Sequence, residues 1–257
     1  MKQKWKKILS LVMALSLILS LMVPVYAAET PTETAEPTTS TVQYTDVAGH
    51  WAEDAILEWS EYGIIAGDGT GKFNPDANIT RAELAKILAE TLKLEVTAEN
   101  QFNDLPSDAW YTPYILKCVA AGIMNGRRNG LVSPSDLVTR QETCKMVAVA
   151  LGLELATGRT DFKDDASIAD WAMPYVSAMR SAGYIQGVGG GLFAPETSLT
   201  RASAVTMLDN AVVAYITQDN TTVTGVQDGI VIIAANGVTL KDATVNGNLI
   251  ICGDNVR

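Results

Sequence analysis

One structural unit recurs three times along this chain, and any fold must accommodate that repeat. Trp51, Trp110 and Trp171 are 59 and 61 residues apart, and Arg81, Arg140 and Arg201 have the same two spacings. Because both ends of the unit keep the same distances, a chance match is improbable. The spacing predicts three tandem copies that pack side by side.

The copies share several short motifs besides the tryptophan and the arginine. Each opens on an aromatic residue two positions before an aspartate, and each has a Gly-rich stretch that ends in x-x-Pro. The openings are Tyr44-Thr45-Asp46, Phe102-Asn103-Asp104 and Phe162-Lys163-Asp164, and the loop ends are Phe73-Asn74-Pro75, Val132-Ser133-Pro134 and Phe193-Ala194-Pro195.

Each copy has the pattern of helix, loop and helix. Ala55, Ile56 and Trp59 have helical spacing, and Gly63 suits the left-handed position after a helix end, as do Gly122 and Gly183. Thr80 and Glu83 form a predicted capping box, which Thr139 and Glu142 repeat, whereas the third copy has Ser203 in place of the acid. Two short helices cannot bury their apolar faces alone, so we expect a mainly α fold of three packed modules.

The N-terminus indicates export. Lys2, Lys4, Lys6 and Lys7 precede an uncharged apolar run over 8–23, and Ala27 closes a small-residue cleavage pattern. We therefore expect a signal peptide over 1–27, with an uncleaved membrane anchor as the alternative. The Thr-, Pro- and Glu-rich stretch 28–43 is a predicted flexible spacer.

The three modules are predicted at 44–97, 98–157 and 158–216, and the pattern then changes. The stretch 217–257 contains short β-type runs separated by Gly and Asn: 231–233, 238–240, 243–245 and 249–251. These runs predict a short β-rich segment, either the first turns of a β-solenoid or a sandwich, and the segment is interpreted as truncated or as a small edge structure.

The net charge and the small number of His and Cys residues exclude several functions. The net charge is −10, and it becomes −14 without the four lysines of the leader. With no basic run after residue 7, the chain is not expected to bind nucleic acid. His50 is the only histidine, and Cys118, Cys144 and Cys252 have no metal-ligand spacing, so no metal or other cofactor is predicted. Buried free thiols are favoured, although Cys118 and Cys144 fall on two helices that could approach each other.

The three units resemble S-layer homology modules over residues 44–213. Gly49-His50-Trp51-Ala52 and Ile79-Thr80-Arg81-Ala82-Glu83 match the family motifs almost letter for letter. The resemblance implies a pseudo-threefold bundle whose inter-module grooves bind a secondary cell-wall polysaccharide linked to peptidoglycan, often through a pyruvylated, anionic sugar. It also implies a secreted, non-enzymatic protein in the cell wall or S-layer of a Gram-positive-type bacterium, without membrane contact after signal cleavage.

In the family, the arginine after the capping threonine contacts the anionic sugar, and by position this role falls to Arg81, Arg140 and Arg201. Each begins a helix, where a cation is electrostatically unfavourable, so its triple use suggests a function. An anion site is one interpretation and an inter-module salt bridge is the other. For a site, replacement by Ala should weaken binding without unfolding the chain. The groove that uses Arg81 is the one most expected to bind the polymer, because the first copy keeps the full motif.

Other candidate polymer-binding residues have simpler alternatives. Trp51, Trp110 and Trp171 offer flat faces for a sugar ring but also suit a helix-packing core. Asp46, Asp104 and Asp164 could reach sugar hydroxyls, although a turn or capping role is the alternative. Glu83 and Glu142 are interpreted as caps, and Asp68 lacks the neighbouring acids of a calcium loop.

Two other functions remain open. One is an S-layer lattice subunit that self-assembles laterally through its β segment. The other is the anchoring part of a longer surface enzyme, since no carboxylate pair in this sequence indicates catalysis.

Overall fold

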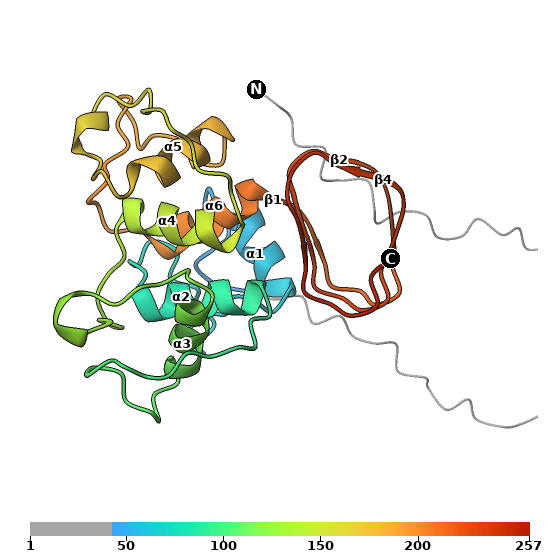
Figure 1. The fold of residues 1–257 in the computed structure, drawn as a ribbon, viewed down its shortest axis with the longest axis horizontal. Helices are drawn as coiled ribbons and strands as arrows, with labels where there is room; N and C mark the ends of the chain where they lie inside the picture. Colours follow the sequence, from blue (N-terminus) through green and yellow to red (C-terminus); the bar gives the residue numbers. More distant parts are fainter. Residues whose placement is uncertain (1–42) are drawn as a thin grey trace, which may run out of the picture. The chain divides into compact units, whose positions relative to one another are not determined.

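The computed structural model describes residues 43–257, so the predicted signal peptide and all of the predicted spacer except Gln43 lie outside it. The described part forms six α-helices and five strands, with two helices in each repeat (Figure 1). No helix within 43–257 is both long and apolar enough to cross a membrane. The helices are α1 (Glu53–Glu61), α2 (Arg81–Thr91), α3 (Thr112–Ala120), α4 (Arg140–Ala150), α5 (Met173–Ser181) and α6 (Arg201–Ala211), with short 3-10 turns η1 (Arg128–Gly130) and η2 (Asp165–Ser167).

The second helix of each repeat begins where the capping motif predicts. The Glu83 amide donates to Thr80 Oγ1 (3.2 Å), and the Thr80 amide donates to the Glu83 carboxylate (2.8 Å). Thr139 and Glu142 form the same box at the start of α4, so both predicted capping boxes are confirmed. In the third repeat, Thr200 still accepts the Ser203 amide at 3.2 Å. Such a cap stabilises a helix by about 1 kcal/mol.

The predicted glycine stops after the first helices are also confirmed. Gly63, Gly122 and Gly183 have φ of 74°, 70° and 78°. An L-residue with a Cβ atom is disfavoured in this left-handed region. These glycines therefore end α1, α3 and α5 and turn the chain into the loop that leads to the second helix.

The three repeats contact one another in a closed cycle. The capping threonine before each second helix pairs with a residue of another repeat: Thr80 with Leu137, Thr139 with Ser198, and Thr200 with Asn78. The helices follow the same order, since α2 packs on α3, α4 on α5, and α6 on α1. The first repeat therefore touches the second, the second the third, and the third the first.

A single cluster of buried apolar side chains runs through all three repeats. Trp59, Phe73 and Phe193 are among the largest side chains that are fully buried. Cys118 and Cys144 are buried free thiols in this core, and Cys252 is half-buried. Because the cluster is continuous, no single repeat is expected to retain its core in isolation.

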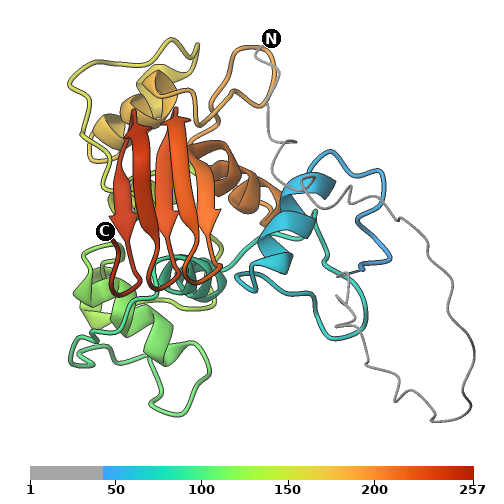
Figure 2. The same ribbon diagram turned by 90° about the vertical axis from the view of Figure 1, so that its right-hand side faces the viewer.

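The C-terminal segment is a coil of short parallel strands. β1 (Val212–Ile216), β3 (Ile230–Ile233) and β5 (Leu249–Ile251) form one sheet, and β2 (Thr222–Gln227) and β4 (Thr239–Val245) form a second (Figure 2). Val212 pairs with Ile230, and Val231 pairs with Leu249, so each strand lies beside the one from the preceding turn. Parallel stacking of successive turns is the arrangement of a solenoid, whereas sandwiches use antiparallel sheets.

Two details of this segment differ from the sequence-based expectation. Except for Val238, the runs predicted at 238–240 and 243–245 belong to one strand, β4. The exposed Lys241 and Asp242 break the apolar pattern of the sequence but do not end the strand. β1 follows α6 directly and lies within the range predicted for the third module. It begins there because Val212 leaves the helical conformation for an extended one.

The coil packs against the ends of two helices. The Tyr215 ring lies against Trp59 (5.6 Å between centroids), and its hydroxyl donates to the Thr91 carbonyl at 3.2 Å. Asn248 Nδ2 donates to the carbonyls of Leu151 (2.9 Å) and Gly152 (2.6 Å). Carbonyls at helix C-termini lack partners within the helix, so these side chains satisfy groups that would otherwise need water.

Candidate functional site

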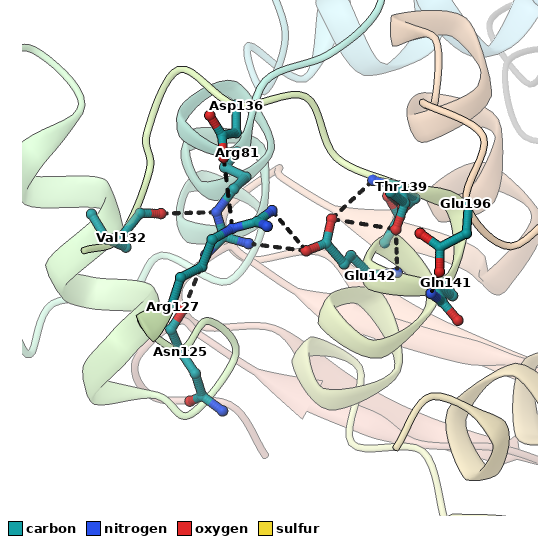
Figure 3. Close-up of polar contacts among 10 residues, drawn as sticks. Arg81, Asn125, Arg127, Val132, Asp136, Thr139, Gln141, Glu142 and Glu196 are labelled. Atoms are coloured by element: carbon teal, nitrogen blue, oxygen red, sulfur yellow. Dashed lines mark hydrogen bonds and ion pairs between the residues drawn. The ribbon is translucent and has the colours of Figure 1, made fainter. Parts of the chain in front are cut away.

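The three predicted arginines bridge neighbouring repeats. Arg81 starts α2, and its guanidinium donates to the carbonyls of Val132 and Asn125 in the second repeat, both at 2.9 Å (Figure 3). Arg140 and Arg201 make the equivalent pairs of bonds to the third and first repeats. Arg81 and Arg140 are 5% and 8% exposed. Their guanidinium groups are therefore part of the contact between repeats.

Two of the arginines also face a carboxylate of the next repeat. Arg201 Nη1 lies 3.4 Å from Glu83 Oε1, and Arg81 Nη1 lies 3.7 Å from Glu142 Oε1. Ser203 replaces the acid in the third repeat, and within residues 43–257 Arg140 has no carboxylate at ion-pair distance. The salt-bridge interpretation therefore applies to Arg81 and Arg201. Burial lowers the pKa of Arg81 and Arg140, and for Arg81 the neighbouring Arg127 adds to this effect.

The three predicted tryptophans lie on the surface. Trp51, Trp110 and Trp171 are 65%, 55% and 48% exposed, which excludes the core-packing interpretation. Lys86 Nζ lies 6.0 Å from the centre of the Trp110 ring, and Lys145 Nζ lies 5.9 Å from Trp171. Each lysine belongs to the second helix of the repeat that precedes its tryptophan, so a cation and an indole face meet at each of these two junctions.

Among the described residues, two cavities contain a lysine together with its tryptophan, and we name them after the helix that lines each one. The α2 groove is about 400 Å³ and includes Glu83, Lys86, Trp110, Arg201 and Asp68. The α4 groove is about 320 Å³ and includes Glu142, Lys145, Trp171, Arg81 and Arg127. In each groove the helix and the loop belong to one repeat, the motif arginine (Arg201 or Arg81) to the preceding repeat, and the tryptophan to the next.

The third repeat differs at the corresponding positions. Along α6, Ser203 stands where the other second helices have glutamate, and Thr206 stands where they have lysine. The Thr206 hydroxyl oxygen is buried and has no hydrogen-bond partner among the described residues. This junction therefore has a guanidinium from Arg140 but neither the acid nor the amine of the two grooves.

The predicted aspartates hold the loops of their own repeats. Asp46 accepts the amides of Phe73 and Asn74, both at 2.8 Å, and Asp104 and Asp164 accept the equivalent pairs. The second residue of each pair has positive φ: Asn74 at 57°, Ser133 at 51° and Ala194 at 56°. The carboxylates thus stabilise an unfavourable backbone conformation in a loop 27 to 30 residues further along the chain, and not a local turn or cap before the first helix, as the simpler interpretation expected.

Hydrogen bonding determines the ionisation of two of these aspartates. Burial alone would raise the pKa of Asp46 and Asp164, but hydrogen bonds from backbone amides, together with a nearby cation (Lys72 or Arg140), hold the pKa of each carboxyl below its usual value. Asp68 is likewise occupied locally, since it accepts hydrogen bonds from Thr70 and Asn74. Within 43–257, no cluster of three or more acidic, His or Cys side chains is placed to hold a metal ion.

Sequence reasoning missed three cations of the grooves. Lys86 and Lys145 each lie five residues after a motif arginine, and this recurrence in two copies was an available signal. Arg127 had no such signal, because the equivalent loop position is Asp68 in the first repeat and Val188 in the third. Arg127 Nη2 lies 2.8 Å from Glu142 Oε1 and its Nε lies 3.8 Å from Asp136 Oδ2 (Figure 3).

The grooves combine an exposed aromatic face with nearby cations. An indole face packs against the apolar face of a ring, and ammonium and guanidinium groups bind carboxylate or phosphate. The arrangement therefore suits a ligand that carries both a ring and a negative charge.

Comparison with known proteins adds an independent finding. A family model described as the S-layer homology domain matches residues 43–85, 101–144 and 161–205. The surface-layer 125 kDa protein of Lysinibacillus sphaericus is 32% identical over 213 residues, which is 81% of this chain and 18% of that protein. The exoglucanase XynX of Acetivibrio thermocellus is 31% identical over 65% of this chain and 16% of its own length. The amylopullulanase of Thermoanaerobacterium thermosulfurigenes is 31% identical over 64% of this chain and 9% of its own length. The chain thus spans less than a fifth of each of these relatives.

Proposed function

This chain belongs to the S-layer homology domain family, and from that premise we propose that it attaches an exported protein to the bacterial cell wall without a covalent bond. The ligand is a secondary cell-wall polysaccharide with an anionic, pyruvylated sugar. The sugar binds in the grooves between repeats, and the protein itself performs no catalysis.

The observation that carries this proposal is the composition of the α2 and α4 grooves. In both, a lysine lies about 6 Å from the face of a largely exposed tryptophan, at 6.0 Å for Lys86 and 5.9 Å for Lys145. The motif arginine of the remaining repeat completes each lining: Arg201 in the α2 groove and Arg81 in the α4 groove. A pyranose ring can stack on the indole while its carboxylate approaches the ammonium group.

The proposal includes a pseudo-threefold arrangement of the modules. It is supported by the closed cycle of contacts, in which the Arg81, Arg140 and Arg201 amides donate to Asp136, Thr197 and Ala77 at 2.9, 3.0 and 2.8 Å. A groove then needs residues from all three repeats. Removal of any one repeat would disrupt both grooves rather than one.

The names of the relatives support a role as an attachment part. Surface-layer proteins and polysaccharide-degrading enzymes share this region, although it is only 9% to 18% of the length of the three relatives described above. A common part in proteins with such different names is more consistent with a shared location than with a shared reaction. For the same reason, this region could serve as the anchoring part of a longer surface enzyme.

A second candidate function is lateral assembly as an S-layer lattice subunit. It is favoured by the relatives, since one of them is named a surface-layer protein, and by Val226 of β2, an apolar side chain that is 63% exposed on the coil. This function can coexist with wall attachment, because the coil and the tryptophans belong to different parts of the described chain.

Cosedimentation with purified wall sacculi tests the attachment. We expect the folded chain to pellet with intact sacculi and to stay in solution with sacculi from which acid has removed the secondary polymer. Equal binding to both preparations would show that peptidoglycan, not the polymer, is the ligand, and the proposal would then be wrong.

A further inference from the structure

The same positions around each groove carry different charges in the three repeats. The loop position is Asp68 in the first repeat, Arg127 in the second and Val188 in the third. On the second helix, the third residue is Glu83, Glu142 or Ser203, and the sixth is Lys86, Lys145 or Thr206. The grooves are thus alike in geometry but not in charge.

The α4 groove has an excess of positive charge. Arg81 and Arg127 both face the same Glu142 oxygen, at 3.7 and 2.8 Å, and Lys145 lines the same cavity (Figure 3). Three cations and one carboxylate therefore line this groove, while two further acids, Asp136 and Glu196, line the adjoining cavity; Asp136 is 58% exposed and lies 3.8 Å from Arg127. This groove stays positive within a chain whose net charge is −10.

The α2 groove is balanced. Its cations are Lys86 and Arg201, and its acids are Glu83 and Asp68. Hydrogen bonds from Thr70 and Asn74 hold the pKa of Asp68 far below its usual value, so this carboxylate is charged. An anionic ligand would meet a negative charge at the loop position where the α4 groove offers a guanidinium.

We infer that the α4 groove is the principal site for the negatively charged group of the wall sugar, and that Arg127 is the residue that determines this preference. The inference rests on the proposed function. Arg127 suits the role because its side chain is 39% exposed, so its guanidinium can reach a ligand without the desolvation that constrains the buried Arg81. The group recognised is a carboxylate or a phosphate, since a guanidinium binds both.

Loop-position substitutions test the inference. Arg127→Asp places the residue of the first repeat in the α4 groove, and Arg128→Asp is the matched control. The control makes the same charge change at the next residue, which is exposed and is not part of the groove lining. The probes are a methyl glycoside of an N-acetylhexosamine with a pyruvate ketal, the same glycoside with a phosphate monoester, and the unmodified glycoside. Affinities are measured by titration calorimetry.

We expect Arg127→Asp to weaken the better-bound charged glycoside by about tenfold or more, the loss of one charge-assisted contact, while Arg128→Asp stays within about twofold. The ratio of the pyruvylated to the phosphorylated glycoside identifies the natural anion. Asp68→Arg should raise the affinity for the same charged glycoside. Arg127→Gln, which adds no negative charge, covers the case in which Arg127→Asp does not fold.

Two results would overturn the inference. Equal weakening by Arg127→Asp and Arg128→Asp would indicate a long-range field and no local contact. A lower melting temperature for Arg127→Gln with unchanged affinity would mean that Arg127 only stabilises the fold through Glu142. If the wild-type chain binds sacculi and Arg127→Gln binds the charged glycosides as tightly as the wild type does, only this inference fails. If the wild type binds neither sacculi nor glycosides, the proposed function fails with it.

Discussion

Arg81 and Glu142 belong to different repeats, yet Arg81 Nη1 lies 3.7 Å from Glu142 Oε1. Glu142 is also the capping residue of α4, since its carboxylate accepts the Thr139 amide at 3.0 Å. The same carboxylate therefore stabilises a helix start, neutralises an inter-repeat arginine and lines the α4 groove. Fold and candidate site share side chains here, so mutations must be chosen to separate the two roles.

The motif arginines are predicted to affect stability before binding. Arg140→Ala removes the donors of the Phe193 and Gln186 carbonyls, at 2.8 and 2.9 Å, in a site where the side chain is buried. We expect a loss of about 2 kcal/mol in the free energy of unfolding and a melting temperature lower by about 4–8 °C. Thermal unfolding followed by circular dichroism measures this. The exposed Arg128→Ala is the control and should change little.

The result for Arg140 separates two uses of the arginines. The sequence alone predicted that Arg→Ala weakens binding without unfolding. An unchanged melting temperature for Arg140→Ala would support that expectation and contradict the role of the guanidinium as a contact between repeats.

The exposed tryptophans are predicted to affect binding without affecting stability. Trp110→Ala with Trp171→Ala removes two side chains that are 55% and 48% exposed, so we expect the free energy of unfolding to change by less than about 1 kcal/mol. Addition of wall polymer should shift the tryptophan emission of the wild type to shorter wavelength, and this shift should be largely lost in the double variant. A full shift in the double variant would mean that the polymer binds away from these rings.

Acid is predicted to loosen the loops held by Asp46 and Asp164. Their backbone amide partners hold the pKa of each carboxyl below its usual value in the folded state. The resulting stabilisation is fully present above the unfolded-state pKa of about 3.9 and is lost as the pH falls through the lower, folded-state pKa. Asp164→Asn should therefore lower stability at pH 7 and flatten its decline below about pH 4. Urea unfolding at several pH values measures both effects, and parallel curves for the two proteins would contradict the assignment.

The exposed face of the coil tests the lattice candidate. Val226→Lys places a charge on β2 at a position that is 63% exposed, and Val96→Lys is the control, because Val96 is 76% exposed and lies outside the coil. If the coil mediates lateral assembly through this face, Val226→Lys should reduce the sedimentation coefficient at high concentration and Val96→Lys should not. Deletion from residue 214 onward is a poor test, because it also removes Tyr215, which covers Trp59. Identical sedimentation of both variants and the wild type would exclude assembly through this face of the coil.

Local features of the fold could be predicted from the sequence because their causes lie within a few residues. The capping boxes of Thr80 and Thr139 and the left-handed glycines at the helix ends depend on neighbours in the chain, and the structure has them where expected. The repeat itself was visible because three copies preserve the same spacings.

Long-range features were not predictable in the same way. The sequence could not tell whether Trp110 faced the core or the solvent, because that depends on the next repeat. Arg127 was passed over as a loop variant, since its partner Glu142 lies on another element and no other copy repeats the pair. The contact of Tyr215 with Trp59 joins residues 156 positions apart, and nothing in the alternation of β1 indicates it.

The two groove lysines give the most direct test of attachment through the grooves. Lys86→Ala with Lys145→Ala removes one ammonium group from each groove, and Lys163→Ala with Lys241→Ala removes the same charge from two exposed positions outside both linings. The measurement is the affinity of each folded double variant for purified secondary wall polymer by titration calorimetry. We expect a loss of about tenfold or more for the groove pair and less than about twofold for the control pair. Wild-type affinity in the groove pair would contradict binding of the polymer in these grooves.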